Sequence, residues 1–324
     1  MHFLASGVRA IVDVPSVHAW ARRVYPASDV DSLRRRLAFE WSAFRHAAAH
    51  REHAAFFERD PWAPVARAHP QLLQKVHKPF AMRGLDVAER GALVRLHYRL
   101  ASDRVGPALL AALAESRDAL LCRVPLPAGR GALPVWLGKQ ARFEREGELT
   151  LSLHDPFGSL FYSTCFTLRE RDGEVALLVG SLNGTAPRDA MRHLTKLSHG
   201  VRPPSLLVIL LQMLARRVGA ARIDAVGRST HAYWGNPRHE EIRFDYDRFW
   251  QEEGGMRGPD GLYELPRAPR RRALVDLPSQ KRASYARRYA WLDELEQVFD
   301  AGWDLAFPAF PFRGSDSADR AANR

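Results

Sequence analysis

The chain has 324 residues, a formal net charge of +11 and only two cysteines. Its length is sufficient for a buried core in one large domain or two ordinary ones, and two cysteines exclude a disulfide-stabilised scaffold. The longest uncharged apolar segment, residues 203–215, is shorter than the roughly 20 residues that a membrane-spanning helix requires, so we expect it to form a buried helix.

The N-terminal segment and the cysteines indicate the compartment. Arg9 and Asp13 interrupt this segment before an apolar stretch of signal-peptide length, and no small-residue cleavage site follows. We therefore predict a cytoplasmic location, in which Cys122 and Cys165 are unpaired, buried thiols.

The positive charge raises the question of a nucleic-acid partner, because basic side chains release counterions from phosphates. Most of the basic residues are arginines, and alanine is abundant, a composition typical of a GC-rich coding sequence. No zinc finger, RNP-type strand or helix-turn-helix pattern accompanies the charge. Nucleic acid is therefore not the expected partner.

The first part of the chain, residues 1–123, is predicted to be helical. From Ser28 an apolar stripe of Leu33, Leu37, Trp41 and Phe44 recurs at helical spacing. The dipeptide 60–61, Asp-Pro, ends this region. Further helices are expected over residues 86–102 and from residue 107, and the Pro/Gly-rich segment 124–134 marks the predicted domain boundary.

After this boundary the apolar period changes from that of a helix to that of a strand. Residues 147–154 alternate leucine with Thr150 and Ser152, which predicts a strand with one wet face. A turn at residues 155–158 joins it to a strand over 159–168, and residues 174–182 are apolar enough for a central strand.

The remaining segments complete the predicted fold. We expect a short helix over residues 186–200, an apolar helix over 203–219, a strand at 222–226 parallel to 174–182, short strands or loops to 266, and a last helix over 279–303. The fold class is α+β: a helical N-terminal region, then a mixed sheet flanked by helices in residues 124–312, and a disordered tail at 313–324.

Several sequence blocks resemble the VirK/YbjX family of bacterial proteins. In chain order they are FEREGELTLSL, FYSTCFTL, VGSLNG, LTKLSHGVRPPSLL, IDAVG, YDRFWQEEGG and PSQKRASYARRYAWL. The resemblance implies an accessory protein linked to virulence, survival in a host, envelope stress and resistance to membrane-active peptides. It implies no particular reaction.

One loop before the apolar helix has the composition of an anion site. A helix N-terminus presents unpaired N–H groups and a partial positive charge, which favours phosphate or carboxylate. The predicted anion-binding residues are Lys196, His199, Gly200, Arg202 and Ser205. The alternative is that His199 and Arg202 hold two helices together through carbonyls and a carboxylate such as Glu146 or Glu148.

The order strand, loop, helix, strand over residues 174–226 is also that of acyl-CoA-dependent N-acetyltransferase-like folds. In those folds the cofactor pyrophosphate lies on the helix N-terminus. An enzyme of this kind needs a base near the amine, and the candidates are His199, Glu148 and Glu146, with acyl-CoA as the candidate cofactor. The alternative for each glutamate is solvation or an ion pair. The segment 180–184, Gly-Ser-Leu-Asn-Gly, lacks the spacing of a hydrolase nucleophile elbow.

Two histidine-containing segments could bind a metal or a ligand, but each also has a purely structural interpretation. His46, His50 and His53 have a spacing that can bind zinc, but we expect an exposed face that holds no metal. The set His231, Tyr233, Trp234 and His239 is expected to be a packed aromatic loop, with a ligand lid as the alternative.

The last helix has its charges in an order that the helix dipole disfavours, basic first and acidic second. We expect acidic groups elsewhere in the fold to compensate. The alternative partners are an anionic membrane surface or an acidic protein. The ligand expected at residues 196–205 is an anionic or phosphate-bearing small molecule.

Overall fold

The computed structural model describes residues 14–127, 131–235, 242 and 244–308. The predicted tail at 313–324, the first 13 residues and His239 lie outside these ranges. The α-helices are α1 (Val14–Val24), α2 (Val30–Arg45), α3 (Ala47–Phe57), α4 (Ala63–Ala68), α5 (Val87–Arg104), α6 (Pro107–Ala114), α7 (Arg188–Leu197), α8 (Pro203–Arg217), α9 (Tyr246–Glu252) and α10 (Ser279–Ala306). The strands are β1 (Ala119–Pro125), β2 (Ala132–Gly138), β3 (Leu149–His154), β4 (Leu160–Arg171), β5 (Glu174–Gly184), β6 (Arg222–Val226), β7 (Met256–Arg257) and β8 (Leu262–Leu265).

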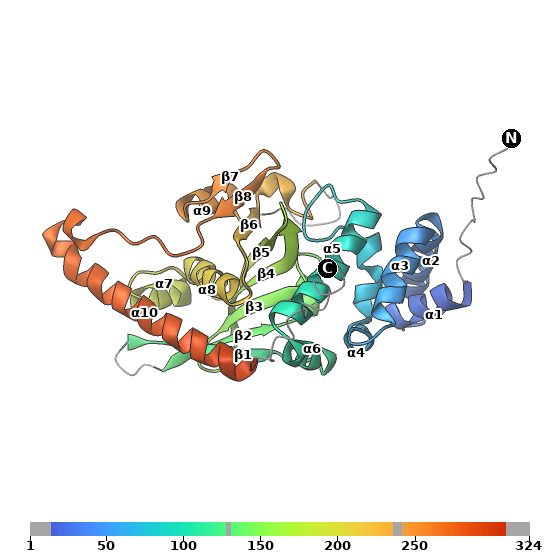
Figure 1. Cartoon of the computed structure of the whole chain (residues 1–324), viewed down its shortest axis with the longest axis horizontal. Helices are drawn as coiled ribbons and strands as arrows, with labels where there is room; N and C mark the ends of the chain where they lie inside the picture. Colours follow the sequence, from blue (N-terminus) through green and yellow to red (C-terminus); the bar gives the residue numbers. More distant parts are fainter. Residues whose placement is uncertain (1–13, 128–130, 236–241, 243, 309–324) are drawn as a thin grey trace, which may run out of the picture.

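The strands form one sheet in the order β1-β2-β3-β4-β5-β6-β8-β7 (Figure 1). Neighbouring strands are antiparallel except for β5 and β6, which are parallel because α7 and α8 carry the chain back across the sheet. The α+β class, the mixed sheet, the β3/β4 hairpin and the parallel pairing of residues 222–226 are confirmed.

The sheet begins earlier in the chain than predicted. Residues 119–138 form the antiparallel hairpin β1/β2, so the predicted helical region already ends at α6 and the boundary at residue 124 lies inside a strand. The Pro/Gly-rich composition predicts a domain boundary, whereas Pro125 ends an edge strand, a position where a missing N–H is tolerated. The division into two domains stays a prediction.

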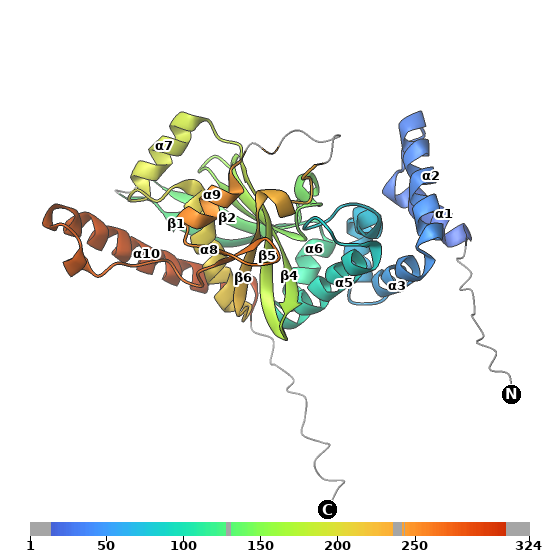
Figure 2. The same ribbon diagram turned by 90° about the horizontal axis from the view of Figure 1, so that it is seen from above.

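Helices cover both faces of the sheet. In the view from above, α5 and α6 lie on one side of it and α8 and α10 on the other (Figure 2). The predicted wet face of residues 147–154 is therefore wrong: Thr150 and Ser152 are as buried as the leucines beside them. Their hydroxyls are accommodated by Cys165 Sγ at 3.5 Å and by the Trp136 carbonyl at 3.5 Å.

Both cysteines are free and buried, as predicted. Burial raises the pKa of the Cys122 thiol to about 12, and burial together with the nearby Glu146 does the same for Cys165. Neither thiol is a thiolate near neutral pH. The apolar segment 203–215 lies within the buried helix α8, as predicted. Among the described residues no helix combines the length and hydropathy needed to cross a membrane.

The predicted apolar stripe of α2 faces outward. Helix α2 begins after Asp29, whose side chain accepts from the Ser32 N–H, and it buries Phe39 and Ala43. Leu33, Leu37, Trp41 and Phe44, on the other side, are exposed. Helical periodicity identified the helix correctly, but it does not tell which apolar stripe meets the core.

The histidines of α3 are also placed differently from the prediction. His50 and His53 are buried, because the segment η1 (Pro70–His77) packs over α3. His50 Nδ1 lies 3.0 Å from His77 Nε2, and His53 Nε2 lies 2.9 Å from the Leu72 carbonyl. In the described ranges no three metal-ligating side chains gather to hold an ion. The predicted exposed histidine face is wrong.

These buried histidines make the fold sensitive to acid. Burial lowers the pKa of His50 to about 4 and, with the neighbouring histidines, that of His77 to about 3. Between an unfolded pKa of about 6.5 and these values the unfolded chain binds protons that the folded chain does not. We expect the free energy of unfolding to fall by at least about 2 kcal/mol from pH 7 to pH 5. Urea unfolding at the two pH values measures it. The variant His77→Leu should have a weaker pH dependence, and equal slopes would contradict this account.

The charges of α10 are compensated within the fold in its second half. Arg216 of α8 pairs with Glu296, Arg217 with Asp304, and Arg271 with Asp293 at 2.6 Å. In the basic half, Arg282 and Arg288 donate to the carbonyls of residues 277 and 199 rather than to carboxylates. This half projects beyond the sheet as an arm (Figure 1).

Candidate functional site

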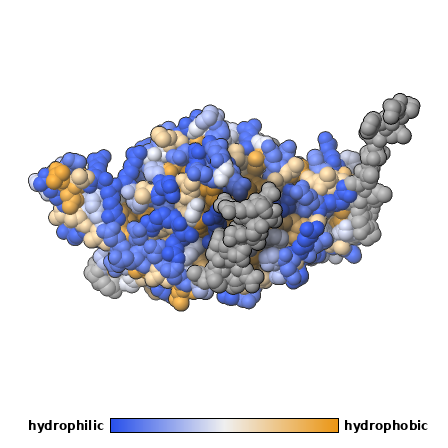
Figure 3. Space-filling model, viewed as in Figure 1, coloured by the Kyte–Doolittle hydropathy of each residue, from blue (hydrophilic) through white to orange (hydrophobic). Residues whose placement is uncertain are grey.

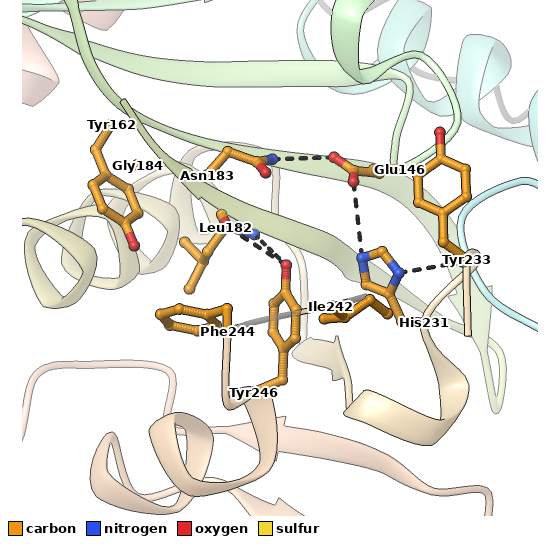
Figure 4. Close-up of a pocket in the computed structure, with 10 residues that line it drawn as sticks. All are labelled: Glu146, Tyr162, Leu182, Asn183, Gly184, His231, Tyr233, Ile242, Phe244 and Tyr246. Atoms are coloured by element: carbon orange, nitrogen blue, oxygen red, sulfur yellow. Dashed lines mark hydrogen bonds and ion pairs between the residues drawn. The ribbon is translucent and has the colours of Figure 1, made fainter. Parts of the chain in front are cut away.

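The sheet opens where β5 and β6 part. The two strands pair only from Ala176–Arg222 to Val179–Ala225. Beyond this point β5 continues to Gly184, while the chain after β6 turns into the short 3₁₀ segment η4 (Arg228–Thr230). A pocket of about 640 Å³ lies there (Figure 4). Its walls are Glu146, Tyr162, Leu182, Asn183, Gly184, His231, Tyr233, Ile242, Phe244 and Tyr246.

A β-bulge shapes this end of β5. Cys165 of β4 faces Ser181, but the next residue, Phe166, faces Val179, so Gly180 is the extra residue. A Cβ at Gly180 would lie 1.7 Å from the Glu146 carbonyl oxygen. Only glycine lets the backbone of residue 146 cross β5 this closely, and this crossing places the Glu146 side chain at the pocket.

The Glu146 carboxyl is held by two side chains of β5. Its Oε2 accepts from Ser181 Oγ at 2.6 Å and from Asn183 Nδ2 at 3.0 Å. Burial raises the pKa of Glu146, and these two hydrogen bonds oppose the shift. Its other oxygen, Oε1, has His231 Nε2 at 3.8 Å, which is too long for a hydrogen bond. Glu146 thus offers one oxygen to a ligand and has a pKa moved toward neutrality, as a general base requires.

His231 faces this oxygen as a neutral imidazole. Burial lowers the pKa of His231 to about 4, so its contact with Glu146 is not an ion pair near neutral pH. Its Nδ1 accepts from the Tyr233 N–H at 3.2 Å, which assigns the ring proton to Nε2. His231 therefore presents a donor to the space in front of Glu146. The predicted aromatic loop contains buried His231, and both His231 and Tyr233 line the pocket.

Tyr246 joins α9 to the end of β5. Its hydroxyl accepts from the Leu182 N–H at 3.1 Å and lies 3.4 Å from the Leu182 carbonyl. Burial raises the pKa of the Tyr246 phenol well above its usual range, so the hydroxyl stays protonated. The backbone N–H of Leu182 is thus hydrogen-bonded to a neutral hydroxyl at the pocket wall.

A second pocket, of about 430 Å³, lies at the N-terminus of α8. Of the predicted anion-binding residues, Gly200, Arg202 and Ser205 line it. Arg202 is half exposed and donates to Glu252 at 2.9 Å, and Ser205 Oγ donates to Glu253 at 2.6 Å. Arg270, Arg272 and Arg288 also line this pocket. The carboxylates that meet Arg202 are therefore those of α9 and the residue after it, not Glu146 or Glu148.

Two predicted members of the anion site lie elsewhere. Lys196 is on α7 and is not among the residues that line this pocket. His199 lines a different pocket, beside Trp291, and its carbonyl accepts from Arg288 Nε at 2.8 Å. Partial burial, with Arg287 and Arg288 nearby, lowers the pKa of His199. His199, Glu146 and Glu148 therefore do not meet at one site.

A buried amide at the floor of the second pocket has an unused acceptor. Gln212 Nε2 donates to the Pro266 carbonyl at 2.8 Å, which fixes the orientation of the amide. Its Oε1 is buried and, within the described chain, has no hydrogen-bond partner. A buried acceptor left unpaired costs about 1–3 kcal/mol, so this amide is a local cost to the fold.

Arg202, Phe249 and Phe244 lie in a row from the second pocket to the first. The Arg202 guanidinium lies 5.9 Å from the centre of the Phe249 ring, and Phe249 lies 5.3 Å from Phe244 of the first pocket. Burial raises the pKa of Tyr162, in the first pocket, to about 12, and Arg202 opposes this shift. Arg202 is thus close enough to act electrostatically on both pockets.

Glu148 is not part of either pocket wall. Its carboxylate is buried between Lys75 Nζ and Lys139 Nζ, each at 2.7 Å. Burial alone would raise the pKa of Glu148, but the two ammonium groups outweigh this and hold the pKa well below its usual range. Glu148 is thus ion-paired, as the alternative in the sequence analysis has it. Its role as a catalytic base stays a prediction.

Sequence reasoning missed Ser181, which holds Glu146, and four pocket residues: Asn183 and Tyr246 in the first pocket and Glu252 and Glu253 in the second. All five lie in the blocks VGSLNG and YDRFWQEEGG. The available signal was a pair of polar residues at the end of an otherwise apolar strand.

The fold and the pockets define an α+β protein with a cavity where two parallel strands diverge. The chain belongs to the family described as "Protein of unknown function (DUF535)", whose model matches residues 28–301. It is similar to "Uncharacterized protein YbjX" of Escherichia coli (strain K12), with 26% identity over 233 residues, which are 70% of each chain. It is also similar to two uncharacterized proteins of Haemophilus influenzae. One is 26% identical over 67% of this chain and 72% of its own, and the other is 31% identical over 48% and 52%.

Proposed function

We propose that this chain is an acyltransferase that moves an acyl group from the thioester of a phosphate-bearing carrier, such as acyl-CoA, to an amine. The observation that carries the proposal is the Glu146 carboxyl, with its raised pKa, in the cavity where β5 and β6 part. Support by analogy comes from the bulged strand, the crossover through α7 and α8 and the parallel strand β6, an order that N-acetyltransferase-like folds share.

The proposed step needs a base and an acceptor for developing negative charge. The amine nitrogen attacks the thioester carbonyl, the C–N bond forms and the C–S bond breaks. Glu146 Oε1 accepts the amine proton, and the carrier leaves as a thiolate that takes up this proton to become a thiol. The Leu182 N–H, after release from the Tyr246 hydroxyl, would stabilise the oxyanion.

The carrier's phosphate groups would occupy the second pocket. The N-terminus of α8 supplies N–H groups and a partial positive charge there. Arg270, Arg272 and Arg288 supply cationic side chains beside Arg202. Phosphate must compete with Glu252 and Glu253 for Arg202 and Ser205, so binding should weaken steeply as salt rises.

A test separates binding from transfer. Thermal shift with acetyl-CoA and longer acyl-CoAs measures binding, and thiol release in the presence of lysine-containing peptides measures transfer. Glu146→Gln should retain the thermal shift and lose about 100-fold in the rate of thiol release, because the base is removed. Glu174→Gln, an exposed carboxyl at the other end of β5, is the control and should keep both.

Two outcomes contradict the proposal. One is the absence of stabilisation by every acyl-CoA, at concentrations far above plausible affinity. The other is an equal rate of thiol release in Glu146→Gln and the wild type.

A second candidate function is a non-enzymatic accessory protein that binds an anionic ligand in the cytoplasm, with a role in virulence or envelope stress. The resemblance to the VirK/YbjX family supplies this biology. The gathering of Arg202, Arg270, Arg272 and Arg288 around the second pocket favours it, since these cations can hold an anion without any chemistry. Under this candidate, a phosphate-bearing ligand raises the melting temperature, Arg202→Ala abolishes the rise, and no acyl-CoA is turned over.

A further inference from the structure

An outward-facing apolar stripe on α2 has no role in the fold or in either pocket. Its members, with their exposed fractions, are Val30 (84%), Leu33 (52%), Leu37 (58%), Trp41 (71%) and Phe44 (43%). Their spacing of three and four residues places them on one side of the helix, opposite buried Phe39 and Ala43. The stripe runs along a helix of 16 residues, about 24 Å. Five large apolar side chains in one row exceed the scattered exposure of an ordinary surface.

Basic side chains accompany the stripe. Arg34 and Arg45 follow its members by one residue, and both are exposed beside it. Glu40, on the opposite flank, is partly buried and accepts from His18 at 2.7 Å, and Asp31 is paired with Arg35. The accessible charge next to the apolar row is therefore positive, in a chain whose net charge is +11.

The position of α2 leaves the stripe open to a large flat partner. Helices α1 and α2 form the end of the molecule farthest from the α10 arm, and the two views agree on this (Figures 1 and 2). In the space-filling view, apolar residues interrupt the hydrophilic surface at this end (Figure 3). The first pocket lies at the sheet, and the second is lined by residues of α8 and α10, so neither includes α2.

We propose that α2 is a docking surface for anionic lipid: the helix lies along a membrane surface with its apolar row between the headgroups. A row of Leu, Phe and Trp with flanking arginines is the composition of interfacial helices, in which the apolar side chains enter the headgroup boundary and the cations meet lipid phosphates. This inference is independent of the acyl-transfer proposal.

A second copy of this chain fits the stripe less well. In an antiparallel pair of α2 helices related by a two-fold axis, each flank meets the same flank of the other copy. Arg34 and Arg45 would then face like charges, which is unfavourable in an interface. An anionic lipid surface satisfies the same residues.

Co-sedimentation of the full chain with vesicles tests the proposal. Binding is expected to vesicles of phosphatidylglycerol and phosphatidylcholine, and to weaken with salt and with pure phosphatidylcholine. Leu37→Glu should lower the partition coefficient at least about tenfold, because a leucine leaves the lipid and an acid enters. Leu305→Glu is the matched control, since Leu305 is 86% exposed on α10, and it should bind as the wild type does.

Two further experiments identify the surface that binds. The double variant Lys281→Glu, Arg282→Glu changes the basic arm of α10, and binding lost only in this variant would assign the membrane contact to the arm and overturn the proposal. The second experiment is sedimentation velocity without lipid. A wild-type dimer that Leu37→Glu converts to a monomer would show that the stripe binds a second copy, and absence of vesicle binding by the wild type would equally refute it.

Discussion

Replacement of Glu148 by glutamine is expected to lower the free energy of unfolding by about 3–5 kcal/mol, the largest effect on stability that we predict. The reason is that Glu148 is the shared counterion of Lys75 and Lys139, whose side chains are almost fully buried. Glutamine keeps the shape and the hydrogen bond from Tyr98, which donates to Oε2 at 3.0 Å, but leaves two ammonium groups without a negative charge.

The cluster also predicts how this loss depends on pH. Burial, only partly opposed by Glu148, lowers the pKa of Lys75 to about 8 in the folded chain, against about 10.4 for a free lysine. Between these values the unfolded chain binds more protons, so the stability of the wild type rises with pH across this window. The variant should show a steeper rise that begins at lower pH, because its lysines have lost their counterion.

Urea unfolding of Glu148→Gln at neutral and alkaline pH measures both effects. The control is the triple variant Lys75→Met, Lys139→Met, Glu148→Leu, which removes all the charges together and should recover most of the lost stability. A loss below about 1 kcal/mol in the single variant would mean that water or movement of the lysines compensates, contrary to this account.

The sheet could be predicted where local patterns and long-range structure agree. The alternation of leucine and polar residues in β3 and the turn at residues 155–158 lead to the hairpin, and the crossover rule gives the parallel strand β6. The strands β1 and β2 were missed because the Pro/Gly-rich composition of residues 124–134 indicates a domain boundary. Their pairing is a property of the whole sheet and not of the segment.

Burial was harder to predict than secondary structure. Thr150 and Ser152 look like a solvated face, and Leu37 and Trp41 look like a core face, yet the structure reverses both. Which side of an element is covered depends on the helices that pack over it. Helix α8 packs on β3 and α5 packs on the neighbouring strand β4, whereas for α2 only the buried side has such a neighbour.

The site was predictable only in its separate parts. Glu146 and Arg202 were both identified as chemically relevant, but the partners Ser181, Asn183, Glu252 and Glu253 come from distant segments. The bulge that brings Glu146 to β5 depends on the close approach of two backbones at Gly180. The sequence shows a glycine at position 180, but only the structure shows that the backbone of Glu146 passes where a Cβ would be.

Gly180→Ala is expected to be the most damaging small substitution at the site. The new Cβ would lie 1.7 Å from the Glu146 carbonyl oxygen and 3.3 Å from that of Ala81, and both are backbone atoms that cannot rotate away. The segment 146–148 must move, so the free energy of unfolding should fall by roughly 3 kcal/mol. Because Ser181 then loses its 2.6 Å hydrogen bond to Glu146, the carboxyl should leave the pocket.

The control is Gly258→Ala, in a surface turn where the nearest atom is the end of the Asp260 side chain at 2.9 Å. That side chain can shift, so this variant should unfold at nearly the wild-type urea concentration. For Gly180→Ala, urea unfolding gives the loss of stability, and any acyl transfer of the wild type should fall with it at temperatures where the variant remains folded. A stable Gly180→Ala chain with wild-type transfer would show that the backbone crossing at Glu146 is not needed to form the site. Loss of stability with transfer intact would confine the role of Gly180 to packing.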